Sequence, residues 1–421
     1  MSRSAPVSVA SSRSPFFTSA YGTILPPPAT REDTTARRGA QRESDVTTLH
    51  ARLLELVRRD GPLGFDRFQE LALYDQADGY YEKAGRVGRS GDFVTAPTWH
   101  PAFGRCLARL LERLPAPAGE GPELLDVGAG EGELLASAAA SLPGALRPRL
   151  LGVERSAVRR RLAQARVASA RWFASLDELP GPVTGLVVAY ELIDALPVRA
   201  LEIGKRGELL ERRVAEGPGG RLVFEAGPCP DGAAIRARLS ERGVVLAPGQ
   251  RFEVRPGAVP VARALAGALR EGILLVFDYG APTRALYGPV RREGTLSAFR
   301  GHEVSRDVLD EPGERDLTAW VDFGEVEEAL AGEGLEVHGL VSQSRLLLSL
   351  GIAGELTTED PEAPASAERI AERRAVAALF APGGMGESIR VLVASRGPGL
   401  PREEAAALTR PAAAGPARGR T

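Results

Sequence analysis

Residues 123–132, which read ELLDVGAGEG, constrain the fold of this chain more than any other segment. The apolar residues of the first half suit a strand that is buried on both faces, as in a parallel sheet. Three glycines at alternate positions then allow positive φ angles and a close approach by a ligand. A helix-forming run follows at 133–140. This order predicts a nucleotide-binding α/β unit whose ligand lies at the carboxyl end of the strand.

The spacing of the glycines indicates which class of ligand this turn accepts. A dinucleotide fingerprint, G-x-G-x-x-G, needs a third glycine where this chain has Glu133. A pyrophosphate at the helix N-terminus would also meet the negative charges of Glu131 and Glu133. A cationic or zwitterionic ligand such as S-adenosylmethionine is more compatible than a nicotinamide dinucleotide. A glycine-rich loop without a ligand is the alternative.

Composition excludes several other classes of function. The 421 residues carry a formal net charge of -2, so no basic field attracts nucleic acid. The two cysteines and four scattered histidines have no metal-site spacing, and we expect no metal. No apolar run reaches the ~18 residues of a membrane span. We expect a cytoplasmic protein, although an Arg/Ser-rich, acid-poor start also resembles a transit peptide.

Composition and periodicity divide the chain into six regions. The middle regions form the fold, and both ends are rich in residues typical of disorder. The predicted regions are a disordered extension 1–45, a helical cap 46–115, a first half of the core 116–200, an inserted substrate lid 201–262, a second half of the core 263–397 with a loop insertion 281–322, and a disordered tail 398–421.

Acidic residues follow two further strands of the predicted sheet. Glu154 ends the second strand, where a ribose-binding carboxylate sits in such folds, although it could simply begin a helix. An apolar strand at 185–189 runs into Tyr190 and Glu191, with Asp194 three residues later. Burying two such acids is costly without partners. We therefore predict that Glu191 and Asp194 are catalytic, against the simpler interpretation that they shape the turn.

These stretches together resemble the MidA-like family of class I S-adenosylmethionine methyltransferases. The resemblance covers about 50–395 and rests on motifs in a fixed order: GYY at 79–81, GDFVTAP at 91–97, the turn at 128–132, E-x-x-DALP at 191–197, DYG at 278–280, RGH at 300–302, and DLT to VDF at 316–323. It implies a Rossmann-like, seven-stranded, mostly parallel sheet with helices on both faces, an N-terminal helical cap and an inserted lid.

The resemblance also implies a cofactor, an acceptor and a binding site. The cofactor is S-adenosyl-L-methionine, and the acceptor is an arginine of a protein such as a respiratory-complex subunit. A homodimer is left open. The residues that we predict to bind the cofactor are Asp92, Thr95, Asp126, Gly128, Gly130, Gly132, Glu154, Ser175, Leu176 and Glu191.

Departures from the family pattern cluster on the substrate side. Tyr190 stands where the family has Asn, Trp320 replaces a usual His, and Trp99 lies where the family has Glu-Ile-Ser. These aromatic residues would suit an aromatic or apolar acceptor. A small-molecule O- or N-methyltransferase is therefore one alternative function. A non-catalytic assembly factor that binds S-adenosylmethionine is another.

Overall fold

A computed structural model describes residues 48–410, except 84, 87, 89–90, 117–119, 147, 357–365 and 399. Its centre is an eight-stranded sheet in which β16 alone opposes the other strands of the main path. The strands in spatial order are β15 (Glu336–Ser342), β16 (Ile389–Arg396), β10 (Leu269–Ala281), β5 (Val183–Tyr190), β2 (Glu123–Val127), β3 (Arg149–Val153) and β4 (Arg171–Phe173), with β14 (Val321–Asp322) paired to β10.

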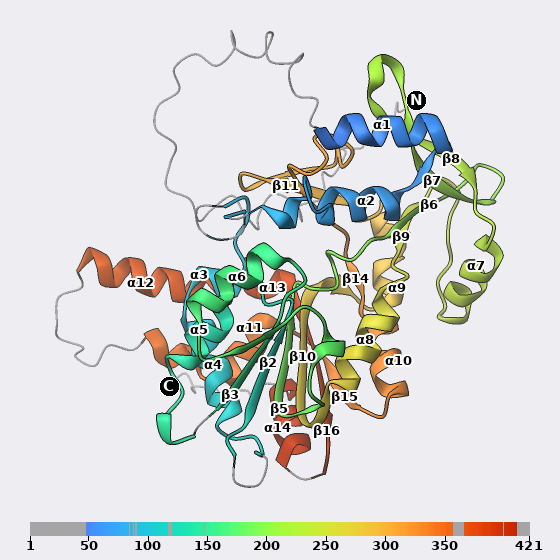
Figure 1. Ribbon diagram of the computed structural model, residues 1–421. Helices are drawn as coiled ribbons and strands as arrows, with labels where there is room; N and C mark the ends of the chain where they lie inside the picture. Colours follow the sequence, from blue (N-terminus) through green and yellow to red (C-terminus); the bar gives the residue numbers. More distant parts are fainter. Residues whose placement is uncertain are drawn as a thin grey trace, which may run out of the picture.

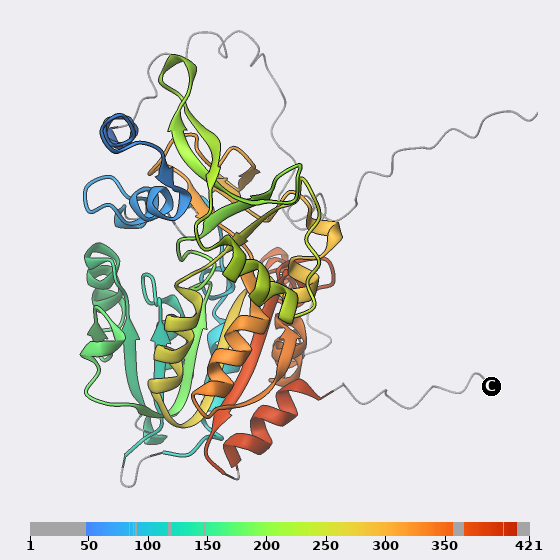
Figure 2. The same ribbon diagram turned by 90° about the vertical axis from the view of Figure 1, so that its right-hand side faces the viewer.

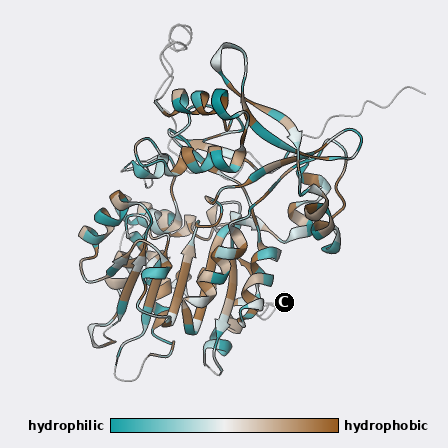
Figure 3. Cartoon of the chain, turned by 45° about the vertical axis from the view of Figure 1, so that its right-hand side comes forward, coloured by the Kyte–Doolittle hydropathy of each residue, from teal (hydrophilic) through white to brown (hydrophobic). Residues whose placement is uncertain are grey.

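Helices cover both faces of this sheet (Figures 1 and 2). Alternate residues of β2, β5 and β10 point into two separate apolar cores, because successive side chains of a strand face opposite ways. One face packs against α4 (Ala102–Leu111), α5 (Glu133–Ala139), α11 (Gln343–Ser349) and α14 (Leu400–Thr409), and the other against α8 (Ala258–Gly267) and α10 (Phe323–Gly332). The predicted α/β class with a mostly parallel sheet is confirmed. The hydrophobic strands inside more polar helices are visible in Figure 3.

A second layer lies over one end of the main sheet (Figure 1). It joins two N-terminal helices to strands from three later parts of the chain through one apolar core. Its elements are α1 (Thr48–Asp60), α2 (Phe65–Tyr74), a five-stranded sheet of β1 (Leu63–Gly64), β6 (Arg199–Ile203), β7 (Leu209–Glu216), β8 (Leu222–Pro228) and β9 (Arg251–Val254), and a three-stranded sheet of β11 (Ser297–Arg300), β12 (Glu303–Ser305) and β13 (Asp316–Thr318).

Side-chain caps mark the start of two of the helices, α6 (Ala157–Arg166) and α10. The Ser156 hydroxyl accepts the N–H of Arg159 at the start of α6. Asp322 accepts N–H groups of Gly324 and Glu325 at the start of α10 and so caps this helix. The other α-helices of the described residues are α3 (Ala96–Trp99), α7 (Gly232–Glu241), α9 (Thr283–Leu286), α12 (Ala367–Ala378) and α13 (Met385–Ser388). No described helix combines the length and apolar character needed to span a bilayer.

Two of the predicted regions differ from the structure. The tail 398–421 contains α14, whose Ala405 and Leu408 are buried in the core, so disorder was the wrong prediction for 400–409. The insertion 281–322 contains α9 and β11–β14 rather than a long loop, because short strands leave little periodicity in the sequence. The predicted disordered extension 1–45 lies outside the described residues.

Candidate active site

A cavity of about 230 Å³ lies at the carboxyl ends of β2, β3 and β5. The last residue of each of these strands lines it. The facing wall comes from the second layer and includes Tyr74 at the end of α2, Tyr81, and Asp316 on β13. The cavity therefore sits between the two layers, at the edge of a parallel sheet where ligands bind in open α/β folds.

The glycine turn forms one side of the cavity. Gly128, Gly130 and Gly132 have φ angles of 76°, 58° and 85°. A β-carbon on Gly130 would meet no atom within 4 Å, so this backbone faces open space that a ligand can occupy. Glu154 braces the turn, because Oε2 accepts the N–H of Gly130 and Oε1 accepts that of Ser156, both at 2.8 Å. Gly132 lies at the start of α5 and outside the cavity lining.

Two buried carboxyl groups, those of Asp126 and Glu154, line the cavity. Asp126 is 3% exposed, and burial followed by repulsion from Glu133 and Glu154 raises its pKa to about 8. Burial also raises the pKa of Glu154, and the nearby Arg159 guanidinium offsets part of that rise. A ligand that brings an ammonium or sulfonium group would favour the ionised carboxylates.

Arg159 supplies a buried cation on the same wall. It is 7% exposed, and its guanidinium carbon lies 4.5 Å from the centre of the Tyr81 ring. Its Nε and Nη2 atoms have no hydrogen-bond partner, although the side chain lines the cavity. Buried donors of this kind are uncommon in native proteins and indicate a missing acceptor. The buried carboxyl groups match the cationic groups of a zwitterionic ligand such as S-adenosyl-L-methionine, and the Arg159 guanidinium matches its carboxylate.

The turn after β5 brings a strained acid to the cavity. Glu191 has φ +47°, which is rare for a residue with a side chain, and its Oε1 is buried without a hydrogen-bond partner. Asp194 is buried beside it, and both line the cavity. Asp278, at the end of β10, accepts the N–H groups of Ile193 and Asp194 and holds this turn in place. Burial raises the pKa of Glu191 and of Asp194 well above the ordinary range.

A buried arginine holds the outer side of this turn. Arg255 donates to the backbone carbonyls of Asp194, Leu196, Ala319 and Trp320 at 2.7–3.2 Å. It therefore ties the turn after β5 to the segment that precedes β14. Its charge also partly offsets the burial that raises the pKa of Asp278 to about 7.

Sequence reasoning missed the cavity residues of the second layer. Tyr81 donates its hydroxyl to Asp316 Oδ1 at 2.8 Å, and burial followed by repulsion from Asp194 raises the pKa of Asp316 to about 7. Both residues lie in motifs that carry the family resemblance, and those motifs could have identified them as site residues. Arg159 had no such signal, because it is one arginine in an arginine-rich helix.

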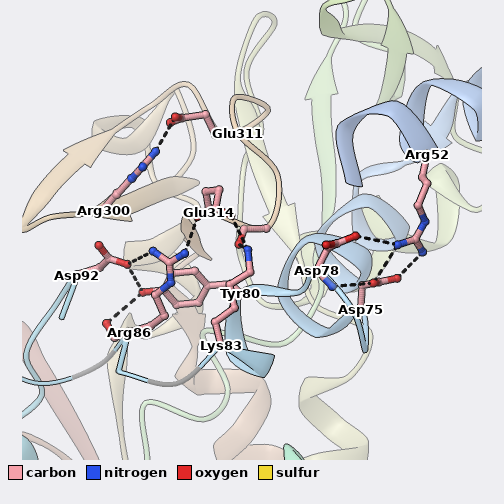
Figure 4. Close-up of polar contacts among 11 residues, drawn as sticks. Arg52, Asp75, Asp78, Tyr80, Lys83, Arg86, Asp92, Arg300, Glu311 and Glu314 are labelled. Carbon is pink, nitrogen blue, oxygen red and sulfur yellow. Dashed lines mark hydrogen bonds and ion pairs between the residues drawn. The ribbon is translucent and has the colours of Figure 1, made fainter. Parts of the chain in front are cut away.

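Some predicted cofactor residues lie away from the cavity lining. Asp92 joins an ionic network instead, accepting the Tyr80 hydroxyl at 3.1 Å and Arg86 at 3.4 Å (Figure 4). It also accepts the N–H of Gly301 at 2.9 Å. Its carboxylate therefore fastens the segment around Tyr80 to the turn after β11. Ser175 and Leu176 also lie outside the lining, and Leu176 packs against the apolar core. Thr95 does line the cavity, where it also caps α3.

The features that favoured an aromatic acceptor or a lid also lie elsewhere. The Trp99 indole donates to the carbonyl of Ala375, and Trp320 packs beside Arg291, so neither lines the cavity. Tyr190 does line it, but its hydroxyl is held by Gln343 in the core. Among the described residues that line the cavity, none lies between 201 and 262. The prediction of a substrate lid in that region is therefore not supported.

Comparisons with known proteins agree with this geometry. Residues 102–341 match the family described as "Putative S-adenosyl-L-methionine-dependent methyltransferase". A Burkholderia thailandensis structure bound to S-adenosyl-homocysteine is 32% identical, has a TM-score of 0.73, and is matched over 83% of this chain and 92% of that chain. A native structure of the same superfamily and organism is 31% identical, with a TM-score of 0.72 over 85% and 93% of the two chains.

Curated relatives extend the match and correct one prediction. A Danio rerio protein named "Protein arginine methyltransferase NDUFAF7, mitochondrial" is 24% identical over 364 residues, which are 77% of this chain and 82% of that protein. Its Mus musculus namesake is 25% identical over 73% and 75% of the two chains. The expected cytoplasmic location is contradicted by this finding, because these relatives are mitochondrial proteins.

Proposed function

The chain belongs to the family of S-adenosyl-L-methionine-dependent methyltransferases, and we propose that its methyl acceptor is the guanidinium group of a protein arginine. The relatives named as protein arginine methyltransferases support this acceptor. The site supports it independently, because the acids at the end of β5 match the donors of a guanidinium. A respiratory-complex subunit is the class of acceptor protein that we propose, and a homodimer stays a prediction.

The residues of the large cavity fit the cofactor. We propose that the backbone of Gly128 and Gly130 contacts its methionyl part, that Asp126 faces its ammonium group and that Glu154 contacts the ribose hydroxyls. Thr95 contributes to the same wall. The cofactor supplies an electrophilic methyl group, whose bond to sulfur breaks with the electron pair going to sulfur as an acceptor nitrogen forms the new N–C bond.

Glu191 and Asp194 prepare the acceptor in this proposal. Their carboxylates accept N–H groups of the guanidinium and orient the nitrogen that reacts. A guanidinium in this position also favours their ionised forms, which burial otherwise disfavours. We propose that Glu191 takes the proton that the nitrogen loses. Positioning and electrostatics therefore provide the catalysis.

The single observation that carries this proposal is the buried, unpartnered Oε1 of Glu191 on a strained backbone at the cavity wall. Stored strain of this kind persists where function requires it. An acceptor that donates a hydrogen bond would complete the site. A small-molecule acceptor has lost two of its three supporting residues, because Trp99 and Trp320 lie outside the cavity.

The test compares Glu191→Gln with the wild type and with Glu327→Gln, which removes an exposed glutamate on α10. Mass spectrometry of the proteome with and without the gene first identifies the methyl mark that is lost. We then expect Glu191→Gln to lower turnover about a hundred-fold. Calorimetry should show an unchanged affinity for S-adenosyl-homocysteine. Full turnover by Glu191→Gln with unchanged cofactor affinity would contradict the proposed role.

A further inference from the structure

A second, smaller cavity of about 20 Å³ adjoins the first. Glu191, Asp194 and Asp316 line both cavities, so these three carboxylates stand at the boundary between them. The small cavity is about large enough for one water-sized group. It can therefore receive one terminal amino group of a larger planar group whose other atoms lie in the adjoining larger cavity.

Aromatic side chains surround the small cavity. Phe93 precedes α3, Tyr279 lies on β10 and Phe299 lies on β11, and all three are partly exposed. These segments are far apart in the sequence, and the fold brings them together at this cavity. Aromatic faces suit the alkyl stem and the cation of an arginine side chain.

We propose that the small cavity receives one terminal amino group of the acceptor guanidinium, whose other atoms lie in the adjoining larger cavity, and that Asp316 is a third recognition carboxylate for this guanidinium. This inference rests on the proposed function and deepens it. The Tyr81 hydroxyl holds Asp316 Oδ1 at 2.8 Å, which fixes the carboxylate in one orientation. The guanidinium then meets acids from two layers of the fold, Asp316 from β13 and Glu191 from the turn after β5.

The charges and the shape together select this occupant. The buried Asp194 and Asp316 and the partly buried Glu191 favour a cation, and Glu191 Oε1 is a buried acceptor that still lacks a donor. Within the described part of the chain, no group of three or more histidine, cysteine, aspartate or glutamate residues could hold a metal ion. A planar cation with several N–H donors on a narrow stem meets these requirements.

A binding experiment tests this inference without relying on turnover. The protein, saturated with S-adenosyl-homocysteine, is titrated with the peptide acetyl-Gly-Arg-Gly-amide and with its citrulline counterpart, which has the same shape but no charge. We expect the arginine peptide to bind at least about ten-fold more tightly, the size of one charge-assisted hydrogen bond. Asp316→Asn should remove most of that preference. Glu303→Gln, on the exposed neighbouring strand β12, should leave it unchanged.

A second variant keeps the inference testable if Asp316→Asn fails to fold. Phe299→Trp adds bulk to the lining of the small cavity, and we expect it to weaken binding of the arginine peptide at least ten-fold with unchanged affinity for S-adenosyl-homocysteine. Equal binding of both peptides by the wild type would overturn the proposed function together with this inference. A clear preference for arginine that survives in Asp316→Asn and Phe299→Trp would overturn the subsite alone.

Discussion

Replacing Asp126 by Asn should make the ligand-free protein less sensitive to alkaline pH. Asp126 is buried, and its pKa is raised from an ordinary 3.8 to about 8 by burial and by the neighbouring Glu133 and Glu154. The folded protein therefore keeps a proton that the unfolded chain releases. The free energy of unfolding must fall as the pH rises from about 4 to about 8. Asn does not titrate, so this part of the pH dependence should disappear.

The size of the effect follows from the two pKa values. Each pH unit in this window changes the free energy of unfolding by up to about 1.4 kcal/mol for one such group. Between pH 6 and pH 8 the wild type should lose roughly 2 kcal/mol through Asp126, because the folded-state carboxyl begins to ionise near the upper limit. Urea unfolding at the two pH values measures this loss. Asp177→Asn, at an exposed aspartate, is the matched control.

The raised pKa of Asp126 also predicts that the protein releases a proton when the cofactor binds. A ligand ammonium near Asp126 favours the ionised carboxylate, so binding near pH 7 should release a proton. Calorimetry in buffers of different ionisation enthalpy counts that proton, and Asp126→Asn should release fewer. An unchanged pH dependence of unfolding in Asp126→Asn would refute the assigned pKa. Unchanged proton release would refute the placement of the ammonium.

Three further substitutions test other parts of the structure. Arg255→Met should destabilise the protein by about 3–5 kcal/mol in urea unfolding, because four buried carbonyls lose their hydrogen-bond donor and the nearby buried acids lose a compensating charge. A loss below about 1 kcal/mol would contradict this bracing role. Gly272→Ala should lower the melting temperature far more than Gly267→Ala. A β-carbon at position 272, where φ is +134°, would lie 1.9 Å from the Gly185 carbonyl oxygen, whereas a β-carbon at position 267 would meet no atom within 4 Å. Equal melting temperatures of the two variants would exclude the clash. Glu154→Gln should weaken S-adenosyl-homocysteine binding about ten-fold in calorimetry and also lower the stability in urea unfolding, because the amide nitrogen cannot accept one of the two N–H groups that the carboxylate holds; unchanged affinity would remove Glu154 from the site.

Much of the core could be predicted from the sequence. The apolar run of β5 and the strand–glycine–helix order around Gly128 are local patterns, and each determines its own element without distant contacts. The same turn indicated the class of ligand, because Glu133 occupies the position where a dinucleotide site needs glycine. Asp126, Glu154 and Glu191 could be identified because each lies at or next to the carboxyl end of a predicted strand. Parallel strands bring these ends to one edge of the sheet.

The second layer could not be predicted in the same way. The region 281–322 was expected to be a loop, because strands as short as β13 carry no readable period. Asp92 was expected at the cofactor, but its partners Tyr80 and Gly301 come from two separate segments that only the fold brings together. The helix α14 was expected to be disorder, because a composition rich in alanine and arginine does not reveal that one face is buried.

The sequence by itself determined the sheet, the glycine turn and the acids at the strand ends, because these depend on residues that are close neighbours in the chain. Only the tertiary structure placed Tyr81, Arg159 and Asp316 around the same cavity. Their roles depend on burial and on charges that come from separate segments. The burial of these side chains and the distances between their charges exist only after the two layers pack together. This packing places buried acids and the Arg159 guanidinium opposite the glycine turn.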